Sequence, residues 1–187
     1  MKLTLATNEE INILHSKFKT FNTSLLEEPS ELYIGIMDVY DRVLTEEEAS
    51  EFLGRDHNLK HGARFVNTFT ELFHIEENEV YVHIYKKGLR KEVFKCILAS
   101  LKRVEASLFR KLFSKRKGIY KIDDVEALAF LTKLSLDELY FADFFFPSLD
   151  TVILGNYDFS FPVYSKTATG FKKCKEIVEE NGLFIRQ

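Results

Sequence analysis

Apolar residues recur every three or four positions in six stretches of this chain, and this spacing predicts amphipathic helices. Two of these helices open at capping boxes, in which Thr7 pairs with Glu10 and Thr45 pairs with Glu48. The predicted helices are residues 7–21, 45–54, 64–75, 89–117, 124–141 with a restart at residue 135, and 169–181. The stretch 89–117 exceeds the usual helix length and suggests a break near Arg103, while Gly182 is the expected left-handed C-cap of the last helix.

Alternating apolar and polar residues predict strands between these helices. Residues 79–85 give the clearest alternation, with valine and isoleucine on one face and Tyr81, His83 and Tyr85 on the other. The other predicted strands are residues 2–6, 32–39, 119–122, 149–154, 159–164 and 183–185. A turn at residues 155–158 predicts a hairpin, and the polar stretch 54–62 is expected to be irregular.

Strands and helices therefore alternate, but the best-supported strand pair is a hairpin. This favours an α+β fold with a mixed or largely antiparallel sheet over a doubly wound parallel one. Several helices, including one long basic amphipathic helix and a C-terminal helix, are expected to pack against the sheet. The length of 187 residues predicts a single domain, 1–187, with two sub-lobes at about 1–85 and 86–187 as the alternative.

Aromatic residues are concentrated in residues 139–146, within a chain that contains 18 phenylalanines and no tryptophan. Consecutive aromatic side chains cannot all face inward from one helix or one strand. Some of them must pack under a loop or form an exposed patch for a partner. Packing into the core is the favoured interpretation, and an interface is the alternative.

The charges are sorted into three blocks. Lys and Arg number 7 against 16 Asp and Glu in residues 1–85, 13 against 2 in residues 86–121, and 6 against 11 in residues 122–187. The net charges of −9, +11 and −5 are hidden in a total of −3. Such a pattern affects association and the choice of partner rather than the fold.

The basic block predicts one of two roles. Its cations could neutralise the phosphates of a nucleic acid, or they could lie against the acidic parts of the same chain. A pI near 6.0 favours the intramolecular role. The residues expected to bind nucleic acid, if the first role holds, are Lys102, Arg103, Arg110, Lys111, Lys115, Arg116 and Lys117.

Catalytic and metal-binding motifs give little support for an enzyme. His57 and His61 have a spacing that suits a metal on a helix, but no third ligand follows at a recognised distance, so both are expected to be solvated loop histidines. The two cysteines, Cys96 and Cys174, are expected to be buried free thiols. No phosphate-binding loop or nucleophile elbow is present. No catalytic residue, metal or cofactor is therefore expected, although a site assembled from distant residues would be invisible in the sequence.

The remaining hypothesis is a small protein that binds or inhibits another protein through an acidic surface. A bacterial immunity protein, which masks a toxin with such a surface, illustrates this class. The residues expected to contact a basic partner are Glu27, Glu28, Glu31, Asp38, Asp41, Glu46, Glu47, Glu48 and Glu51. The N-terminus lacks the apolar core of a signal peptide, and no apolar stretch approaches the ~20 residues that span a bilayer, so a cytoplasmic location without membrane contact is expected.

Overall fold

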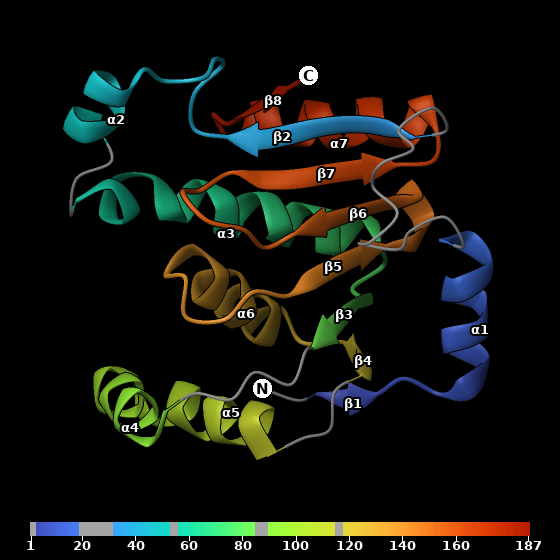
Figure 1. Cartoon of the computed structure of the whole chain (residues 1–187). Coiled ribbons are helices and arrows are strands. Elements are labelled where there is room, and N and C mark those ends of the chain that lie inside the picture. Colours follow the sequence, from blue (N-terminus) through green and yellow to red (C-terminus); the bar gives the residue numbers. More distant parts are fainter. Residues whose placement is uncertain (1–2, 19–31, 53–55, 85–89, 115–117) are drawn as a thin grey trace.

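The structure is a computed structural model that describes residues 3–18, 32–52, 56–84, 90–114 and 118–187. Within these residues, eight strands form one sheet in the order β1-β4-β3-β5-β6-β7-β2-β8, and every pair is antiparallel (Figure 1). The predicted α+β fold with a largely antiparallel sheet is therefore confirmed. Strands from both halves of the sequence are neighbours in this order, so the described residues of both halves share one sheet.

Seven of the eight described strands overlap the predicted stretches, whereas β5 was not predicted as a strand. Their bounds are β1 Thr4–Leu5, β2 Tyr33–Asp38, β3 Val80–Ile84, β4 Gly118–Ile122, β5 Asp143–Phe146, β6 Thr151–Leu154, β7 Phe161–Ser165 and β8 Phe184–Arg186. In β3, Val82 lies opposite Tyr120 of β4 on one side and Phe144 of β5 on the other. The predicted hairpin is formed by β6 and β7, where Ile153 pairs with Val163.

Three helices, α1, α2 and α6, begin at the predicted capping residues Thr7, Thr45 and Asp124. Their bounds are α1 Asn8–Lys17, α2 Glu46–Phe52, α3 His57–Ile75, α4 Lys91–Ser100, α5 Arg103–Ser114, α6 Val125–Leu136 and α7 Ala168–Glu180, with a short 3-10 turn, η2, at Pro147–Leu149. The capping box of Thr7 and Glu10 is present in full. Gly182 has a φ of +72° after α7, as expected of a left-handed C-cap.

The long basic helix is two helices, with the break near Arg103 as suggested, because Leu101 adopts an extended backbone between α4 and α5. Two other predicted helix boundaries are wrong. Helix α3 starts at His57, inside the stretch expected to be irregular, since the His57 ring packs among Tyr40 and Phe159. Helix α6 ends at Leu136 without the expected restart, because the next residues turn back toward the sheet with a positive φ at Glu138.

Apolar side chains cover both faces of the central strands. On one face, α3, α6 and α7 contribute to the larger core cluster, in which the Phe69 ring lies 4.6 Å from the ring of Phe144. On the other face, Leu14 and Phe18 of the α1 segment pack on Phe145 and Val152, and the rings of Phe18 and Phe145 are 5.5 Å apart. The sheet is thus sandwiched between a thick helical layer and the single helix α1.

This arrangement explains the run of phenylalanines. Phe144 and Phe146 belong to the larger cluster, whereas Phe145 belongs to the smaller cluster under α1. All four residues of β5 are buried. Core packing of the aromatic run is therefore confirmed, because consecutive residues of a strand face opposite sides and both sides are covered here.

The closest backbone approach in this core is at Gly170, in the first turn of α7. A methyl group at Gly170 would meet the carbonyl oxygen of Leu149 at 1.8 Å. We expect Gly170→Ala to lower the free energy of unfolding by about 2 kcal/mol or more in urea titrations, because overpacking against backbone outweighs the better helix propensity of alanine. Gly118→Ala is the matched control, since the new methyl would only touch the flexible end of Leu5 at 3.4 Å. Equal stabilities for the two variants would contradict this packing.

Candidate functional site

Helix α2 is held to the fold by its ends rather than by a buried face. Thr45 and Glu48 cap each other's backbone N–H groups. The Arg42 guanidinium donates two hydrogen bonds to Glu48, at 2.7 and 2.6 Å, and these bonds lower the pKa of Glu48 to about 2. The ring of Phe52 at the other end stacks on Tyr40 at 5.9 Å. Glu48 is therefore used to shape the helix, whereas its neighbours remain available.

The outer side of α2 is acidic with apolar residues at its margin. No residue of α2 is buried. Asp41, Glu46, Glu47 and Glu51 are exposed, and no ion pair joins them to any described residue. Val43 and Phe52 are 75 % and 40 % exposed, so two large apolar side chains flank the three glutamates in the sequence. These six residues are called the α2 surface below.

The other residues expected to contact a partner are not part of this surface. Asp38 is only 7 % exposed and forms an ion pair with Arg186 of the terminal strand. Its carboxylate also accepts hydrogen bonds from the Ser160 hydroxyl and the Tyr40 backbone N–H. Asp38 therefore joins β2 to β8 and is not exposed as expected. Glu27, Glu28 and Glu31 lie outside the described residues.

The basic segments form a second charged surface. Helices α4 and α5 place an apolar stripe on the larger core cluster, including Ile97, Leu108 and Phe109. Their exposed cations are Arg90, Lys91, Lys95, Lys102, Arg103 and Arg110, and these six residues are called the α4–α5 surface below. Lys111 is also exposed, whereas Lys115, Arg116 and Lys117 lie outside the described residues.

The two charged surfaces are far apart. Figure 1 shows α2 and the α4–α5 pair at opposite ends of the molecule. Among the described residues, the ion pairs of the α2 segment are confined to Arg42 with Glu48. The interpretation that the basic block neutralises this acidic segment within the chain therefore finds no support in the described part of the structure.

His57 and His61 are not solvated loop residues. They occupy the first and second turns of α3, with ring centroids 4.8 Å apart, and His57 is only 6 % exposed. His57 Nδ1 lies 3.1 Å from the Phe52 carbonyl oxygen, while His57 Nε2 and His61 Nδ1 are buried without a hydrogen-bond partner. No group of three potential metal ligands occurs within the described residues. The pair is therefore a buried aromatic contact beneath α2.

The two cysteines lie in different environments. Both cysteines are free. Burial raises the pKa of Cys174 to about 12, so its thiol is protonated and unreactive. Cys96 was expected to be buried but is exposed, because it lies on the outer side of α4.

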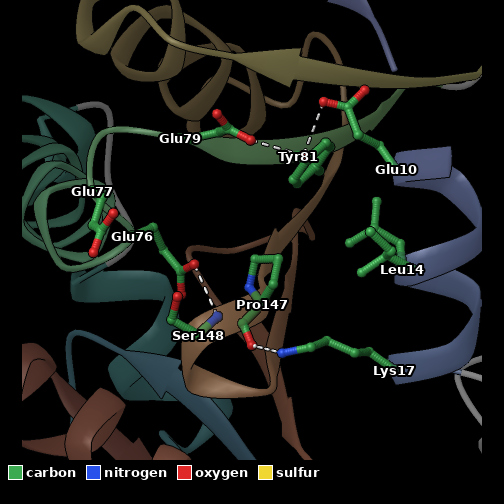
Figure 2. Close-up of a pocket in the computed structure, with 10 residues that line it drawn as sticks. Glu10, Leu14, Lys17, Glu76, Glu77, Glu79, Tyr81, Pro147 and Ser148 are labelled. Carbon is green, nitrogen blue, oxygen red and sulfur yellow. Dashed lines mark hydrogen bonds between the residues drawn. The ribbon is translucent and has the colours of Figure 1, made fainter. Parts of the chain in front are cut away.

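A pocket of about 410 Å³ lies between α1 and the segment around η2 (Figure 2). Four glutamates line it, Glu10 from α1 and Glu76, Glu77 and Glu79 from the turn between α3 and β3, together with Lys17 and Tyr81. Glu76 is buried at its base and accepts N–H bonds from Ser148 at 2.9 Å and from Leu149 at 3.2 Å. Its burial raises the pKa of the carboxyl group, and the two N–H bonds offset this effect in part.

The opposite wall of this pocket is a charge network around Tyr81. Lys121 forms ion pairs with both Glu10 and Glu79, and the Tyr81 hydroxyl lies 2.8 Å from a Glu79 oxygen. Figure 2 shows Glu10 and Glu79 on either side of the Tyr81 ring. Hydrogen bonds from Thr7 lower the pKa of Glu10, so this carboxylate is ionised and committed to the cap of α1. These carboxylates stabilise the fold, and no free acid and base face each other here.

Sequence reasoning missed this pocket for a clear reason. Tyr81 and Lys121 lie 71 and 111 positions after Glu10 in the sequence. They meet only because β3 pairs with β4 and α1 crosses that part of the sheet. The only local signal was the capping box at Glu10, which points to a structural role.

Comparison with known proteins gives no relative. No protein-family model matches the chain, and neither the curated proteins nor the solved structures contain a significant match. Within the described residues, no helix has the length and apolar character needed to cross a membrane. The choice of functional surface therefore depends on the side chains described above.

The histidine pair predicts a stability that depends on pH. Burial lowers the pKa of His57, and burial together with the nearby His57 lowers the pKa of His61. The unfolded chain protonates both rings below about pH 6.5, where the folded protein resists protonation. Because the unfolded state then binds more protons, the free energy of unfolding should fall as the pH drops below about 6.5.

Urea titrations between about pH 5.5 and 7.5 measure this dependence. The double variant His57→Gln/His61→Gln should show a smaller loss of stability over this interval than the unmodified protein. His15→Gln is the control, because His15 is exposed on α1. A double variant with an unchanged pH dependence would show that the pair does not titrate in this way.

Proposed function

We propose that this protein binds a basic surface of another protein through the α2 surface. The observation that carries the proposal is a helix with no buried residue, whose exposed carboxylates adjoin exposed Val43 and Phe52. An isolated seven-residue helix has little stability of its own, and a chain that preserves one at its surface needs a reason to do so. Binding a partner supplies that reason.

The composition of the α2 surface supports association in two ways. Burying Val43 and Phe52 against a partner would remove exposed apolar area from water at about 25 cal/mol per Å². Asp41, Glu46, Glu47 and Glu51 would steer a basic partner toward the surface and speed its encounter. Protein interfaces combine apolar contacts with polar and charged residues in this way.

A finer version of this proposal is an inhibitor that masks the active site of a basic target, as immunity proteins do. The acidic character of the α2 surface supports it, since such a target would present cations around its site. The two unpaired cysteines fit a reducing compartment, so we propose that the binding takes place in the cytoplasm.

Reversing two charges on one side of α2 tests the binding surface. Glu47 and Glu51 are four positions apart and share a helix face, while Glu48 is left intact because it holds Arg42. The variant Glu47→Lys/Glu51→Lys should keep its free energy of unfolding within about 0.5 kcal/mol, because solvated charges contribute little. Affinity capture from the native host should then lose at least about nine-tenths of any partner that the unmodified protein retains, as expected when steering and rim contacts are lost.

The matched control is Glu71→Lys/Glu180→Lys, which makes the same change in net charge at two exposed positions on α3 and α7. This control should capture the same partner as the unmodified protein. If the α2 variant also captures that partner in equal yield, the α2 surface is not the binding site.

A nucleic-acid-binding role of the α4–α5 surface is the alternative function. The observation in its favour is that six exposed cations lie on these helices without an acidic neighbour from α2. If the α4–α5 surface binds phosphates, affinity for duplex DNA should fall with salt at a slope of about −0.9 per phosphate contacted.

We expect instead that mobility-shift assays at about 0.15 M salt show only nonspecific binding, with dissociation constants no tighter than about 10⁻⁶ M. Tighter binding that is lost in Lys102→Gln/Arg103→Gln/Arg110→Gln would favour the alternative over protein binding.

A further inference from the structure

The two charged surfaces are complementary in the sign of their charge. The α2 surface carries four exposed carboxylates, and the α4–α5 surface carries six exposed cations. Each also has exposed apolar area, from Val43 and Phe52 on one and from Val104 on the other. Each surface therefore has the chemistry expected of a partner for the other.

The fold prevents the two surfaces from meeting within one molecule. Helix α2 follows β2, and α5 precedes β4, with five strand spacings between these two strands in the sheet. At about 4.8 Å per spacing, they are about 24 Å apart. Salt screens exposed charges over about 8 Å at physiological ionic strength, so the two surfaces hardly neutralise each other inside one chain.

We infer that the α2 surface of one copy docks on the α4–α5 surface of a second copy of this chain. Two α2 surfaces repel each other, as do two α4–α5 surfaces, so only the unlike surfaces can meet. Such an interface is heterologous, because each copy contributes a different patch to it. The inference rests on the proposed function, since it uses the α2 surface as a binding surface, and it names one partner for that surface.

Sedimentation velocity of the full chain tests this inference. The weight-average sedimentation coefficient should rise with protein concentration at about 0.01 M salt, where charges act over about 30 Å, and should rise much less at about 1 M salt. A protein that remains monomeric at all concentrations and both salt levels would overturn the inference.

A charge-swap experiment identifies the two surfaces. Glu47→Lys/Glu51→Lys brings the net charge of the α2 surface from −4 to 0, because Asp41 and Glu46 remain. Arg103→Glu/Arg110→Glu lowers the net charge of the α4–α5 surface from +6 to +2 and changes one side of α5, because these arginines are seven positions apart. Each variant alone should therefore associate much less than the unmodified protein. An equimolar mixture of the two variants should recover association, because the intact α4–α5 surface of the first variant can meet the intact α2 surface of the second.

The control is Glu71→Lys/Glu180→Lys, which has the net charge of the first variant but leaves both surfaces intact and should associate like the unmodified protein. Self-association of either charge-swapped variant at the unmodified level would show that another contact is responsible. If the unmodified protein is monomeric but the α2 variant still loses a captured partner, the self-association is overturned and the proposed binding function of the α2 surface is retained. If association is lost in each variant and recovered in the mixture, and no other protein is captured through the α2 surface, then the partner of the α2 surface is a second copy of this chain.

Discussion

Strand β5 has apolar side chains on both of its faces, and the architecture follows from the need to cover them. Phe144 and Phe146 require the helical layer of α3 and α6, whereas Phe145 requires a second cover on the opposite face. Helix α1 supplies that cover with Leu14 and Phe18. A strand that is buried on both faces must lie inside the sheet rather than at its edge, and β5 is paired with β3 and β6 on its two sides.

Several charged residues form ion pairs or hydrogen bonds that join the strands and helices around this core. Asp38 and Arg186 tie the short terminal strand to β2, and Glu76 fixes η2 through the backbone N–H groups of Ser148 and Leu149. Lys121 joins the cap of α1 to β3 through Glu10 and Glu79. An acidic residue in this chain is therefore a candidate for binding only if it is exposed and lacks a structural partner. Within the described acidic segment, Asp41, Glu46, Glu47 and Glu51 meet that condition, whereas Asp38 and Glu48 do not.

The sequence predicted the helices and strands better than it predicted the tertiary contacts of their side chains. Capping residues, alternation and turn residues are local signals, so seven of the eight described strands, the cap at Thr7 and the C-cap at Gly182 agree with the structure. Strand β5 was not predicted, because its consecutive aromatic residues lack the alternation of a strand with one buried face. The start of α3 was missed because the partners that bury His57, Tyr40 and Phe159, lie far along the chain.

The same limit applies to the candidate surfaces. The charge blocks were visible in the sequence, but the pairing of Asp38 with Arg186 across 148 positions was not. Nor could the sequence show that the strand order separates the acidic helix from the basic pair. Whether a charged residue pairs within the fold or stays exposed for a partner depends on its neighbours in the folded chain. Neighbouring positions in the sequence do not reveal those neighbours.

The separation of charge is a consequence of the same core. Helices α3 and α6 lie over the middle of the sheet and α7 lies over its β7-β2-β8 end, while the elements with the highest charge, α2 and the α4–α5 pair, lie at opposite ends of the molecule (Figure 1). Charges of one sign repel within each end, and the distance between the ends prevents their mutual neutralisation at physiological salt. Neither arrangement stabilises the folded chain, because solvated charges contribute little. The most direct physical effect of this charge distribution is on what approaches the molecule, which is why both the proposed function and the proposed self-contact lie at its ends.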